Sequence, residues 1–444
     1  MSIHKNSIKN DAISIFYSGL NKCKPIESLS KNIKLIKENQ NKAIRISKTN
    51  FVLSPKCEVI VIGAGKASSQ MAFSLESKIK EVISRGIVIT PYKYKKNCEK
   101  IEILEASHPL PDENGVNHTN QIISLAEKCK KNDLVIFLLS GGASSLLVKP
   151  AKGIELKEKS WLIEKLLNAG STINELNCVR KHLSEIKGGQ LALKIFPAKL
   201  ITLYISDVID NKLDVIGSGP TYGDNTTFKD AYKILLEKKL WKISSKNIRN
   251  HIEMGIDGII KETPSRKSIP ENKSNFFLMS DIDTALTASL KKAKSLGYKT
   301  KLFRKKIQGE AKEVGRHLSI IAKKEKSKKA IPCCIICGGE TTVKVTGNGK
   351  GGRCQELALA FSKEICGISK IVLLASGTDG KDGPTNASGA IVNGRTINSK
   401  RLIIDSDEAL RNNNSNVFLE SRKSLFKTGP TGTNVMDIII LLIR

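Results

Sequence analysis

The chain lacks the features that mark membrane-spanning proteins. In its 444 residues, no apolar run approaches the roughly 20 residues that cross a bilayer. The first residues contain neither a long apolar core nor a small-residue cleavage site, so we expect no secretory signal peptide. These absences predict a cytoplasmic protein with no membrane partner.

Arginine is also scarce. The formal net charge is +30, yet only 13 of the 73 basic residues are arginine and the rest are lysine. The lysines are spread over almost every expected element, and few aromatic residues stand beside them for base stacking. A nucleic-acid-binding protein would instead gather its basic residues into a patch or stripe. We interpret the charge as a compositional bias toward Lys, Asn and Ile, and we expect no nucleic-acid partner.

The ten cysteines do not have the density of a disulfide-stabilised domain. Cys334 and Cys337 match a CxxC spacing, but they fall in an apolar run that predicts a strand, where residues three apart face opposite sides. No second pair and no nearby histidine completes a zinc site. We therefore expect small, buried, reduced thiols.

Length and pattern predict two α/β domains. A chain of 444 residues exceeds one ordinary core. Several apolar runs lead into glycine turns and then into helical periodicity, which is the pattern of βα units in a parallel sheet. A polar, irregular stretch between about residues 246 and 275 marks the expected boundary. We expect an N-terminal domain over 1–270, helical up to about residue 48, and a C-terminal domain over 271–444.

Two βα turns in the N-terminal half are candidates for anion binding. The apolar run 58–62 leads into Gly63-Ala64-Gly65-Lys66, and the run 133–139 leads into Ser140-Gly141-Gly142-Ala143-Ser144. Backbone N–H groups at helix starts favour phosphate or carboxylate, and Lys66 would oppose the helix dipole unless an anion binds there. The alternative is that the glycines serve packing alone. Neither a P-loop nor a complete GxGxxG is present, because Ser68 stands at the third glycine.

A glycine-rich loop in the C-terminal half has the same character. Residues 333–337 predict a strand that ends at Gly338-Gly339, and residues 341–346 predict a second strand. The loop 347–352 then leads to Arg353 at the start of a helix. Glycine lets the backbone approach a phosphate closely, so the candidate binding residues here are Gly338, Gly339, Glu340, Asn348, Gly351 and Gly352. The alternative is a mobile loop with solvated cations.

Three aspartates are candidate magnesium ligands. Asp207 follows the predicted strand 200–205, and Asp379 and Asp382 lie in the turn GTDGKDGPT. Mg²⁺ prefers oxygen ligands and usually takes one or two carboxylates. Asp207 is equally suited to accept a proton. The alternative for each aspartate is to cap a turn.

Four further residues each have two interpretations. His108 suits a catalytic base, but a histidine before proline also suits a loop hydrogen bond. Arg180, Lys181 and Lys187 suit either a solvated helix face or contact with an acidic ligand. The sequence alone does not choose between these uses.

Taken together, the motifs resemble the class II glycerate 2-kinase family, whose C-terminal half is often called the MOFRL domain. The matching segments cover nearly the whole chain in the family's order: VIGAGKAS (61–68), HPLPDENG (108–115), LLSGGASSLL (138–147), NCVRKHLSEIKGGQLA (177–192), ISDVI (205–209), GSGPT (217–221), GGETTVKVTGNGKGGRCQE (338–356), GTDGKDGPT (377–385) and TGPTGTN (428–434).

The resemblance implies an enzyme that uses ATP and Mg²⁺ to phosphorylate D-glycerate at its 2-hydroxyl. It also implies a Rossmann-like N-terminal sheet, a C-terminal α/β domain with a mixed sheet, and an active site in the cleft between them. The family's catalytic cations correspond to Lys66 and Arg353, with Asp207 as a third catalytic candidate and Asn434 among the binding residues. Cys354 stands where the family usually has Asn, and Ala143 replaces a third glycine.

Two other functions remain as alternatives. A hydroxypyruvate reductase that uses NAD(P)H would need a complete dinucleotide fingerprint with an acidic ribose-binding residue. A non-enzymatic anion-binding module would not need the aspartate-bearing loops. The sequence leaves open which domain holds the nucleotide, which hydroxy acid is preferred, and whether the protein is a homodimer.

Overall fold

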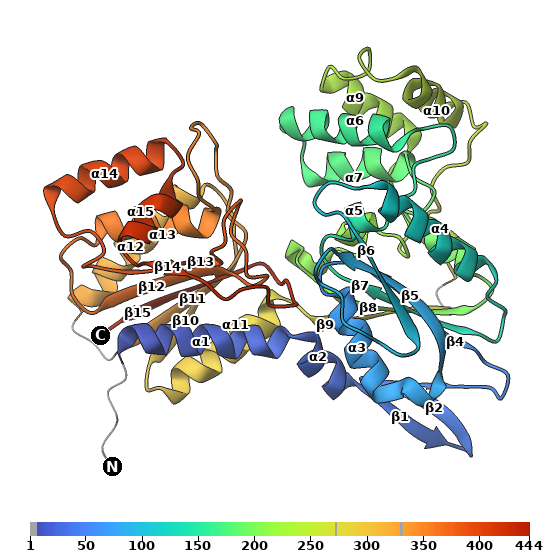
Figure 1. The fold of residues 1–444 in the computed structure, drawn as a ribbon, viewed down its shortest axis with the longest axis horizontal. Coiled ribbons are helices and arrows are strands. Elements are labelled where there is room, and N and C mark those ends of the chain that lie inside the picture. The colour runs from blue at the N-terminus through green and yellow to red at the C-terminus, as the bar shows by residue number, and fades with distance from the viewer. Residues whose placement is uncertain (1–6, 271–272, 329–331) are drawn as a thin grey trace. The chain divides into compact units, whose positions relative to one another are not determined.

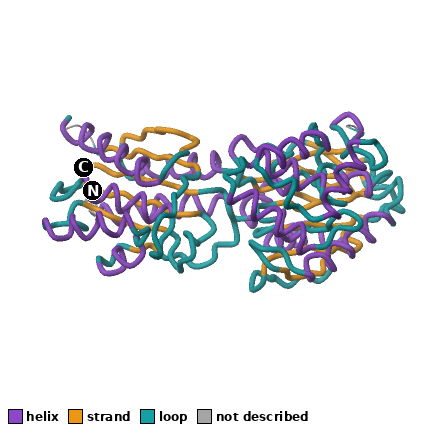
Figure 2. The backbone as a smooth tube through the Cα atoms, turned by 90° about the horizontal axis from the view of Figure 1, so that it is seen from above, coloured by secondary structure: helices purple, strands orange, loops and turns teal. Residues whose placement is uncertain are grey.

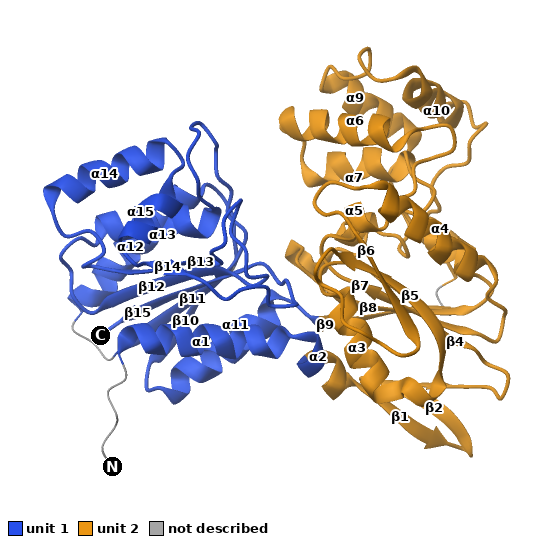
Figure 3. Cartoon of the chain, viewed as in Figure 1, with its two compact units in different colours: residues 1–27, 280–444 blue, residues 28–279 orange. Residues whose placement is uncertain are grey.

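The computed structural model describes residues 7–270, 273–328 and 332–444. The chain divides into two compact units, Ser28–Met279 and Met1–Glu27 with Ser280–Arg444 (Figure 3). This division differs from the expected boundary near residue 270, because helix α1 (Ile8–Cys23) packs against α11 (Ile282–Ser295). A Cβ at Gly19 would stand 2.8 Å from the Ala285 carbonyl oxygen, so glycine allows the two helices to approach closely. The sequence showed an apolar helix face but not which core it would cover.

Unit 28–279 contains a doubly wound sheet. Its strand order is β6-β5-β4-β7-β8-β9, and β6 to β8 are parallel. The order reverses between β4 and β7, which is where ligands bind in such sheets. The strands are β4 (Val59–Ala64), β5 (Ile83–Pro91), β6 (Ile101–Ala106), β7 (Leu134–Leu139), β8 (Lys199–Ile205) and β9 (Ser274–Ser280).

The helices of this unit form two groups. Helices α4 (Glu113–Glu127), α5 (Ala143–Leu146) and α8 (Gln190–Ile195) share an apolar core with one face of the sheet. Helix α3 (Ser68–Ile79) contacts β4, β5 and β7. A separate group of helices (Figure 1) has its own apolar core, which is rich in leucine and isoleucine side chains. It consists of α6 (Leu156–Asn168), α7 (Ile173–His182), α9 (Phe228–Glu237) and α10 (Lys246–Ile256).

The expected helix up to residue 48 is wrong beyond α2 (Pro25–Asn32). Residues 33–52 form an antiparallel sheet of β1 (Ile33–Glu38), β2 (Asn41–Ile46) and β3 (Thr49–Val52). Asn39 and Gln40 both have positive φ and connect β1 to β2 in a two-residue turn. Such turns match the twist of a hairpin, so local turn geometry overrides the helical periodicity of the apolar residues.

The second unit contains a mixed sheet in the order β10-β11-β15-β12-β13-β14. Strands β10 and β11 are parallel, and β15 is antiparallel to both β11 and β12. Helices α1 and α11 contact one face of this sheet, and α12 and α13, which pack against each other, cover the other face. Figure 2 shows the strands flanked by helices. The remaining elements are β10 (Lys299–Ile307), α12 (Ala311–Ser327), β11 (Cys333–Gly339), α13 (Arg353–Glu364), β12 (Ile371–Gly377), β13 (Gly389–Asn393), α14 (Lys400–Arg411), α15 (Ser415–Ser421), β14 (Leu425–Phe426) and β15 (Asp437–Ile443).

The expected α/β class, with a parallel N-terminal sheet and a mixed C-terminal sheet, is confirmed. The strand expected over 341–346 is wrong, because Thr342 forms only an isolated bridge with Glu310. The backbone of Thr346 instead donates to the side chain of Asn413. Among the described helices, none is both long enough and apolar enough to cross a membrane.

Candidate functional site

The turns after β4 and β7 are joined through their backbones. The Lys66 N–H donates to the Gly141 carbonyl at 2.8 Å, and the Ser140 N–H donates to the Ala64 carbonyl at 3.3 Å. The Ser140 hydroxyl also accepts a hydrogen bond from the Ala67 N–H at 3.0 Å. The two turns that the sequence singled out separately are therefore one structural element, located where the strand order reverses.

Lys66 and His108 both lie over Gly142. A Cβ at Gly142 would stand 2.9 Å from His108 Nε2 and 3.2 Å from Lys66 Cγ. Its φ is +84°, which also favours glycine. The structure thus brings Lys66 to the second glycine turn and adds His108, which the sequence had left undecided.

Asp207 reaches the same element. A Cβ at Gly141 would stand 1.8 Å from Asp207 Oδ2, so the carboxylate rests against the Gly141 backbone. Asp207 is half-buried and comes two residues after the end of β8. A cation, an imidazole and a carboxylate therefore meet at the carboxyl edge of the parallel sheet.

Four other predicted binding residues of this unit have structural contacts. A Cβ at Gly63 would stand 2.6 Å from the Leu138 carbonyl oxygen, and one at Gly65 would stand 2.2 Å from Ser140 Oγ. Ser140 Oγ also lies 3.2 Å from Ser68 Oγ, and Ser144 Oγ lies 3.1 Å from Ser218 Oγ. These contacts hold the turns together, and direct contact with a ligand stays a prediction for these residues.

A cavity of about 400 Å³ begins at the second glycine turn. His108, Gly142 and Ser144 line one part of it, and the helical cluster supplies the rest of the wall. Three basic side chains from that cluster and the loop after it line the cavity: Lys159, Arg180 and Lys187. Arg180 and Lys187 therefore do not lie on the solvated face that was one of their two interpretations.

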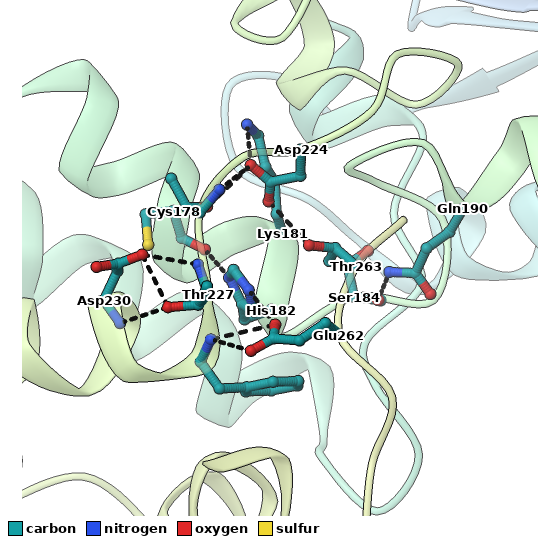
Figure 4. A network of polar contacts seen from close by, with 12 residues as sticks. Cys178, Lys181, His182, Ser184, Gln190, Asp224, Thr227, Asp230, Glu262 and Thr263 are labelled. Carbon is teal, nitrogen blue, oxygen red and sulfur yellow. Dashed lines mark hydrogen bonds and ion pairs between the residues drawn. The ribbon is translucent and has the colours of Figure 1, made fainter. Parts of the chain in front are cut away.

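Lys181 has a different environment from its neighbour Arg180. Its ammonium group forms a buried ion pair with Asp224 at 3.1 Å (Figure 4). His182, the next residue, is hydrogen-bonded to the Cys178 carbonyl and to Glu262. These contacts tie α7 to the segments around Asp224 and Glu262, so we assign Lys181 a structural role.

Lys159 is a site residue that the sequence interpretation missed. It lies on α6 with Leu162 and Leu166, which belong to the core of the helical cluster, and it is itself buried. A lysine on the apolar face of a helix was the available signal, because lysine is almost never fully buried without a specific partner. Burial, followed by repulsion from Arg180, lowers the pKa of Lys159 to about 7.

Arg353 is held by two carboxylates in the other unit. Its Nε and Nη2 donate to Asp437 Oδ2 and Oδ1 at 2.6 and 2.8 Å, and its Nη1 lies 2.8 Å from Glu340 Oε1. Burial alone would lower the pKa of Arg353, but the charges of Asp437 and Glu340 raise it above its ordinary value. The sequence identified Arg353 and Glu340 but missed Asp437, the first residue of β15.

Asp382 caps helix α13. Its carboxylate accepts hydrogen bonds from the backbone N–H groups of Cys354 and Gln355 at 3.1 and 2.9 Å. A Cβ at Gly352 would stand 2.3 Å from the Asp382 Cγ, so glycine is required by this close approach. Burial and the Asp437 charge raise the pKa of Asp382 to about 6. Both oxygens are thus used within the fold, and its predicted role as a magnesium ligand remains untested.

Other predicted residues of this unit surround Arg353 or support its loops. Asp379 Oδ1 and Asp437 Oδ1 would each stand 3.4 Å from a Cβ at Gly377. Asn434 accepts a hydrogen bond from the Met436 N–H just before β15. Three of the predicted glycines lie close to other parts of this unit: Gly338 to Ile282, Gly339 to Ile307 and Gly351 to Ser415. Asn348 is exposed.

The donor chemistry of the aspartates fits magnesium better than a softer metal. No group of three or more His, Cys, Asp or Glu side chains that could hold a metal is found in the described ranges. Mg²⁺ does not need such a group, because it keeps several waters and uses one or two carboxylates. Asp207 is half-buried beside the glycine turns, and Asp379 is half-buried beside Asp437. Each could supply a carboxylate oxygen.

Comparison with known proteins identifies the family. Residues 11–253 match the model described as "Domain of unknown function (DUF4147)", and residues 333–437 match the MOFRL family. The chain is 40% identical to D-glycerate 2-kinase of Thermotoga maritima over 87% of this chain and 90% of that protein. It is 37% identical to glycerate 2-kinase of Pyrococcus horikoshii over 90% and 92%.

A further relative and a solved structure complete the comparison. A protein of Agrobacterium vitis provisionally named as a hydroxypyruvate reductase is 38% identical over 89% of each chain. The crystal structure of a glycerate kinase from Thermotoga maritima superimposes with a TM-score of 0.83 and 35% identity, covering 98% of this chain and 99% of that one. The chain belongs to the glycerate 2-kinase family with a MOFRL domain.

Proposed function

We propose that this protein is a glycerate 2-kinase, which transfers the γ-phosphoryl group of ATP to the 2-hydroxyl of D-glycerate and yields 2-phosphoglycerate and ADP. The observation that carries the proposal is the joined pair of glycine turns at the switch point, where Lys66 lies beside Gly142 and Asp207 beside Gly141. Phosphoryl transfer mainly requires positioning and charge neutralisation. This arrangement offers backbone N–H donors, a cation and a carboxylate for those tasks.

The proposed roles follow from the charges of the side chains. Lys66 and Arg353 are each proposed to neutralise negative charge on phosphate oxygens. The carboxylate of Asp207 would accept the proton that the 2-hydroxyl loses as its oxygen attacks phosphorus. The bond from phosphorus to the bridging oxygen of ATP breaks in the same transfer, and the electron pair leaves with ADP.

Magnesium is part of the proposal as the ion that accompanies ATP. A bound Mg²⁺ would neutralise part of the triphosphate charge. Asp207 and Asp379 are the proposed ligands, and Asp382 is a weaker candidate because its oxygens already cap α13. The sequence left open whether the protein is a homodimer. Light scattering on the purified protein would test this.

Hydroxypyruvate reduction is the second candidate, because one relative has that provisional name. The turn after β4 does not favour it. Ser68 occupies the position of the third fingerprint glycine, and its hydroxyl lies 3.2 Å from Ser140 Oγ inside the fold. Strand β5 ends in Ile-Thr-Pro, without an acidic residue for a ribose.

An assay that separates the two phosphoglycerates tests the proposal. The protein is incubated with D-glycerate, ATP and Mg²⁺, and enolase converts any 2-phosphoglycerate to phosphoenolpyruvate, which absorbs in the ultraviolet. The absorbance signal should appear without added phosphoglycerate mutase. Enolase does not act on 3-phosphoglycerate, so that product would give no signal unless the mutase were present. A signal that appears only with mutase would show the wrong regiochemistry. Oxidation of NADH or NADPH with hydroxypyruvate, and no kinase activity, would favour the reductase.

A further inference from the structure

Three buried or half-buried cations line the cavity next to the second glycine turn. The Lys159 ammonium donates to the carbonyls of Leu183 and Arg180 at 2.6 and 3.3 Å. The Lys187 ammonium donates to the carbonyls of Leu147 and Gly217 at 3.1 and 3.4 Å. Both lysines are buried. The guanidinium of Arg180 makes no hydrogen bond or ion pair within the described part of the chain.

No carboxylate balances this positive charge inside the cavity. Glu164 is the one acidic residue among the described lining residues, and it is exposed. Burial lowers the pKa of Lys187, and repulsion from Lys159 and Arg180 lowers it further. Burying like charges together is unfavourable unless an opposite charge joins them. An anion bound in the cavity would favour the charged forms of both lysines.

Apolar side chains form much of the rest of the cavity wall. Aliphatic side chains from the loop after His108, from the segment after α5 and from α6 line it: Leu110, Val148, Leu156, Ile163 and Leu167. Leu110 and Leu167 are 69% and 53% exposed. Large apolar side chains at the opening of a charged cavity suit a ligand that has both an anionic part and a flat apolar part.

We infer that this cavity is the nucleotide site, with the triphosphate of ATP on Lys159, Arg180 and Lys187 and the adenine against the leucine and isoleucine side chains. The inference rests on the proposed kinase function. Charge favours ATP over glycerate, because a carboxylate carries a single negative charge, whereas a triphosphate carries several and can contact all three basic side chains. Size agrees, since about 400 Å³ falls within the roughly 300–1,000 Å³ of sites for drug-sized ligands. Gly142 lies in the same lining and beside Lys66, so the terminal phosphate would end at the glycine turns.

The test is direct binding of ATP to the full chain without glycerate, by isothermal titration calorimetry. Arg180→Met should weaken ATP binding at least tenfold. Because the guanidinium has no partner in the described residues, this variant should keep the wild-type melting temperature. Lys157→Met, which removes an exposed lysine two residues from Lys159 on α6, should bind ATP within twofold of wild type. Unchanged ATP affinity in folded Arg180→Met would overturn the inference.

Inorganic tripolyphosphate separates the two parts of the proposed site. Arg180→Met should weaken binding of both ATP and tripolyphosphate, whereas Leu167→Ala should weaken ATP alone by severalfold. If Arg180→Met instead raises the KM for D-glycerate and leaves ATP binding unchanged, the cluster binds the substrate carboxylate and the inference is wrong. The wild-type enolase assay tests the proposed function separately. A wild-type kinase with unaltered ATP binding in Arg180→Met would refute the nucleotide site alone.

Discussion

Arg353 and Asp437 form a two-point ion pair between the start of a helix and the start of a strand. The two contacts measure 2.6 Å from Nε to Oδ2 and 2.8 Å from Nη2 to Oδ1. Asp437 is buried and Arg353 is partly exposed. The geometry fixes the plane of the guanidinium, so the remaining Arg353 donors point in one direction. We interpret Asp437 as the residue that positions Arg353.

Replacing Asp437 should therefore affect both stability and turnover. Asp437→Asn should lower the free energy of unfolding by roughly 3 kcal/mol, because one partner of a largely buried pair is lost. It should also lower kcat more than it raises either KM, since Arg353 would still be present but misoriented. Glu340→Gln is the matched control, because its side chain is more exposed. An exposed pair contributes about 1 kcal/mol or less. Equal effects of the two variants in urea unfolding and steady-state kinetics would contradict the positioning role.

Comparing Gly142→Ala with Gly297→Ala should separate the effect of backbone strain from the effect of displacing side chains at the site. An added Cβ would meet His108 at 2.9 Å and displace it or Lys66. Gly297 has the same φ of +84° and no atom within 4 Å of its hypothetical Cβ, so Gly297→Ala carries the strain alone. Both variants should lose about 1 kcal/mol of stability. Only Gly142→Ala should lower kcat/KM, by tenfold or more, and equal kcat/KM values would show that the contacts over Gly142 do not matter.

Asp382 should make stability depend on pH between about 4 and 6. Its pKa is raised to about 6 in the folded protein, compared with about 3.9 for an aspartate in an unfolded chain. The folded state therefore holds the proton more tightly, so the stabilisation is complete below pH 4 and is lost as the pH rises through 6. The loss is roughly 3 kcal/mol for a shift of about two pH units.

Asp382→Asn provides the measurement for this pH effect. The free energy of unfolding in urea is compared between wild type and variant at several pH values from 4 to 7. The wild type should lose about 3 kcal/mol relative to the variant across that range. Parallel curves would mean that Asp382 is ionised in the folded protein throughout, with its helix-capping hydrogen bonds compensating for burial.

Apolar runs and glycine turns in the sequence predicted those parts of the fold that depend on contacts between residues close in the chain. The apolar run of β7 and the glycine turn after it were readable because a buried parallel strand needs such a run and its turn needs glycine. The hairpin at Asn39 was not readable, because apolar spacing in β1 also fits a helix. The placement of α1 depends on its contact with α11, which is far away in the sequence.

The candidate site shows the same limit. Lys66 and Arg353 were found because each follows a glycine turn at a helix start. Asp437 was missed because 84 residues separate it from Arg353. Lys159, Arg180 and Lys187 come from α6, α7 and a loop, and only the folded chain brings them around one cavity. Lys159, a charged residue on the apolar face of α6, was the one local signal for this cluster.

Binding of ATP should be accompanied by proton uptake at Lys159. The pKa of this lysine is about 7 in the protein without ligand, and a triphosphate beside it would raise the pKa. At pH 8 the free side chain is mostly neutral, so binding takes up a proton and affinity should fall as the pH rises from 7 to 8. Below about pH 6 it is already charged and no further gain is expected. The charged or titratable groups near it include Arg180, Lys187, His108 and Glu164 along the cavity and His251 on α10.

Calorimetry in buffers with different ionisation enthalpies measures this uptake. ATP itself titrates near neutral pH, so Lys159→Met serves as the reference in which the contribution of the nucleotide remains. At pH 8 the wild type should take up more protons than the variant, by a fraction approaching one. Equal uptake would mean that Lys159 does not sense the nucleotide.

The aspartates should differ in how they depend on magnesium. Asp207 lies against Gly141 in the glycine turns, and Asp379 lies beside the Arg353–Asp437 pair. Asp207→Asn should lower turnover at saturating ATP, because it removes either a metal ligand or the proton acceptor. Asp379→Asn should mainly raise the magnesium concentration needed for half-maximal rate. Asp257→Asn, at an exposed position at the end of α10, is the control. Binding of Mn²⁺, followed by electron paramagnetic resonance with ATP present, gives a readout independent of turnover. Unchanged turnover and unchanged metal binding in Asp207→Asn would leave Asp207 with a structural role at the turn.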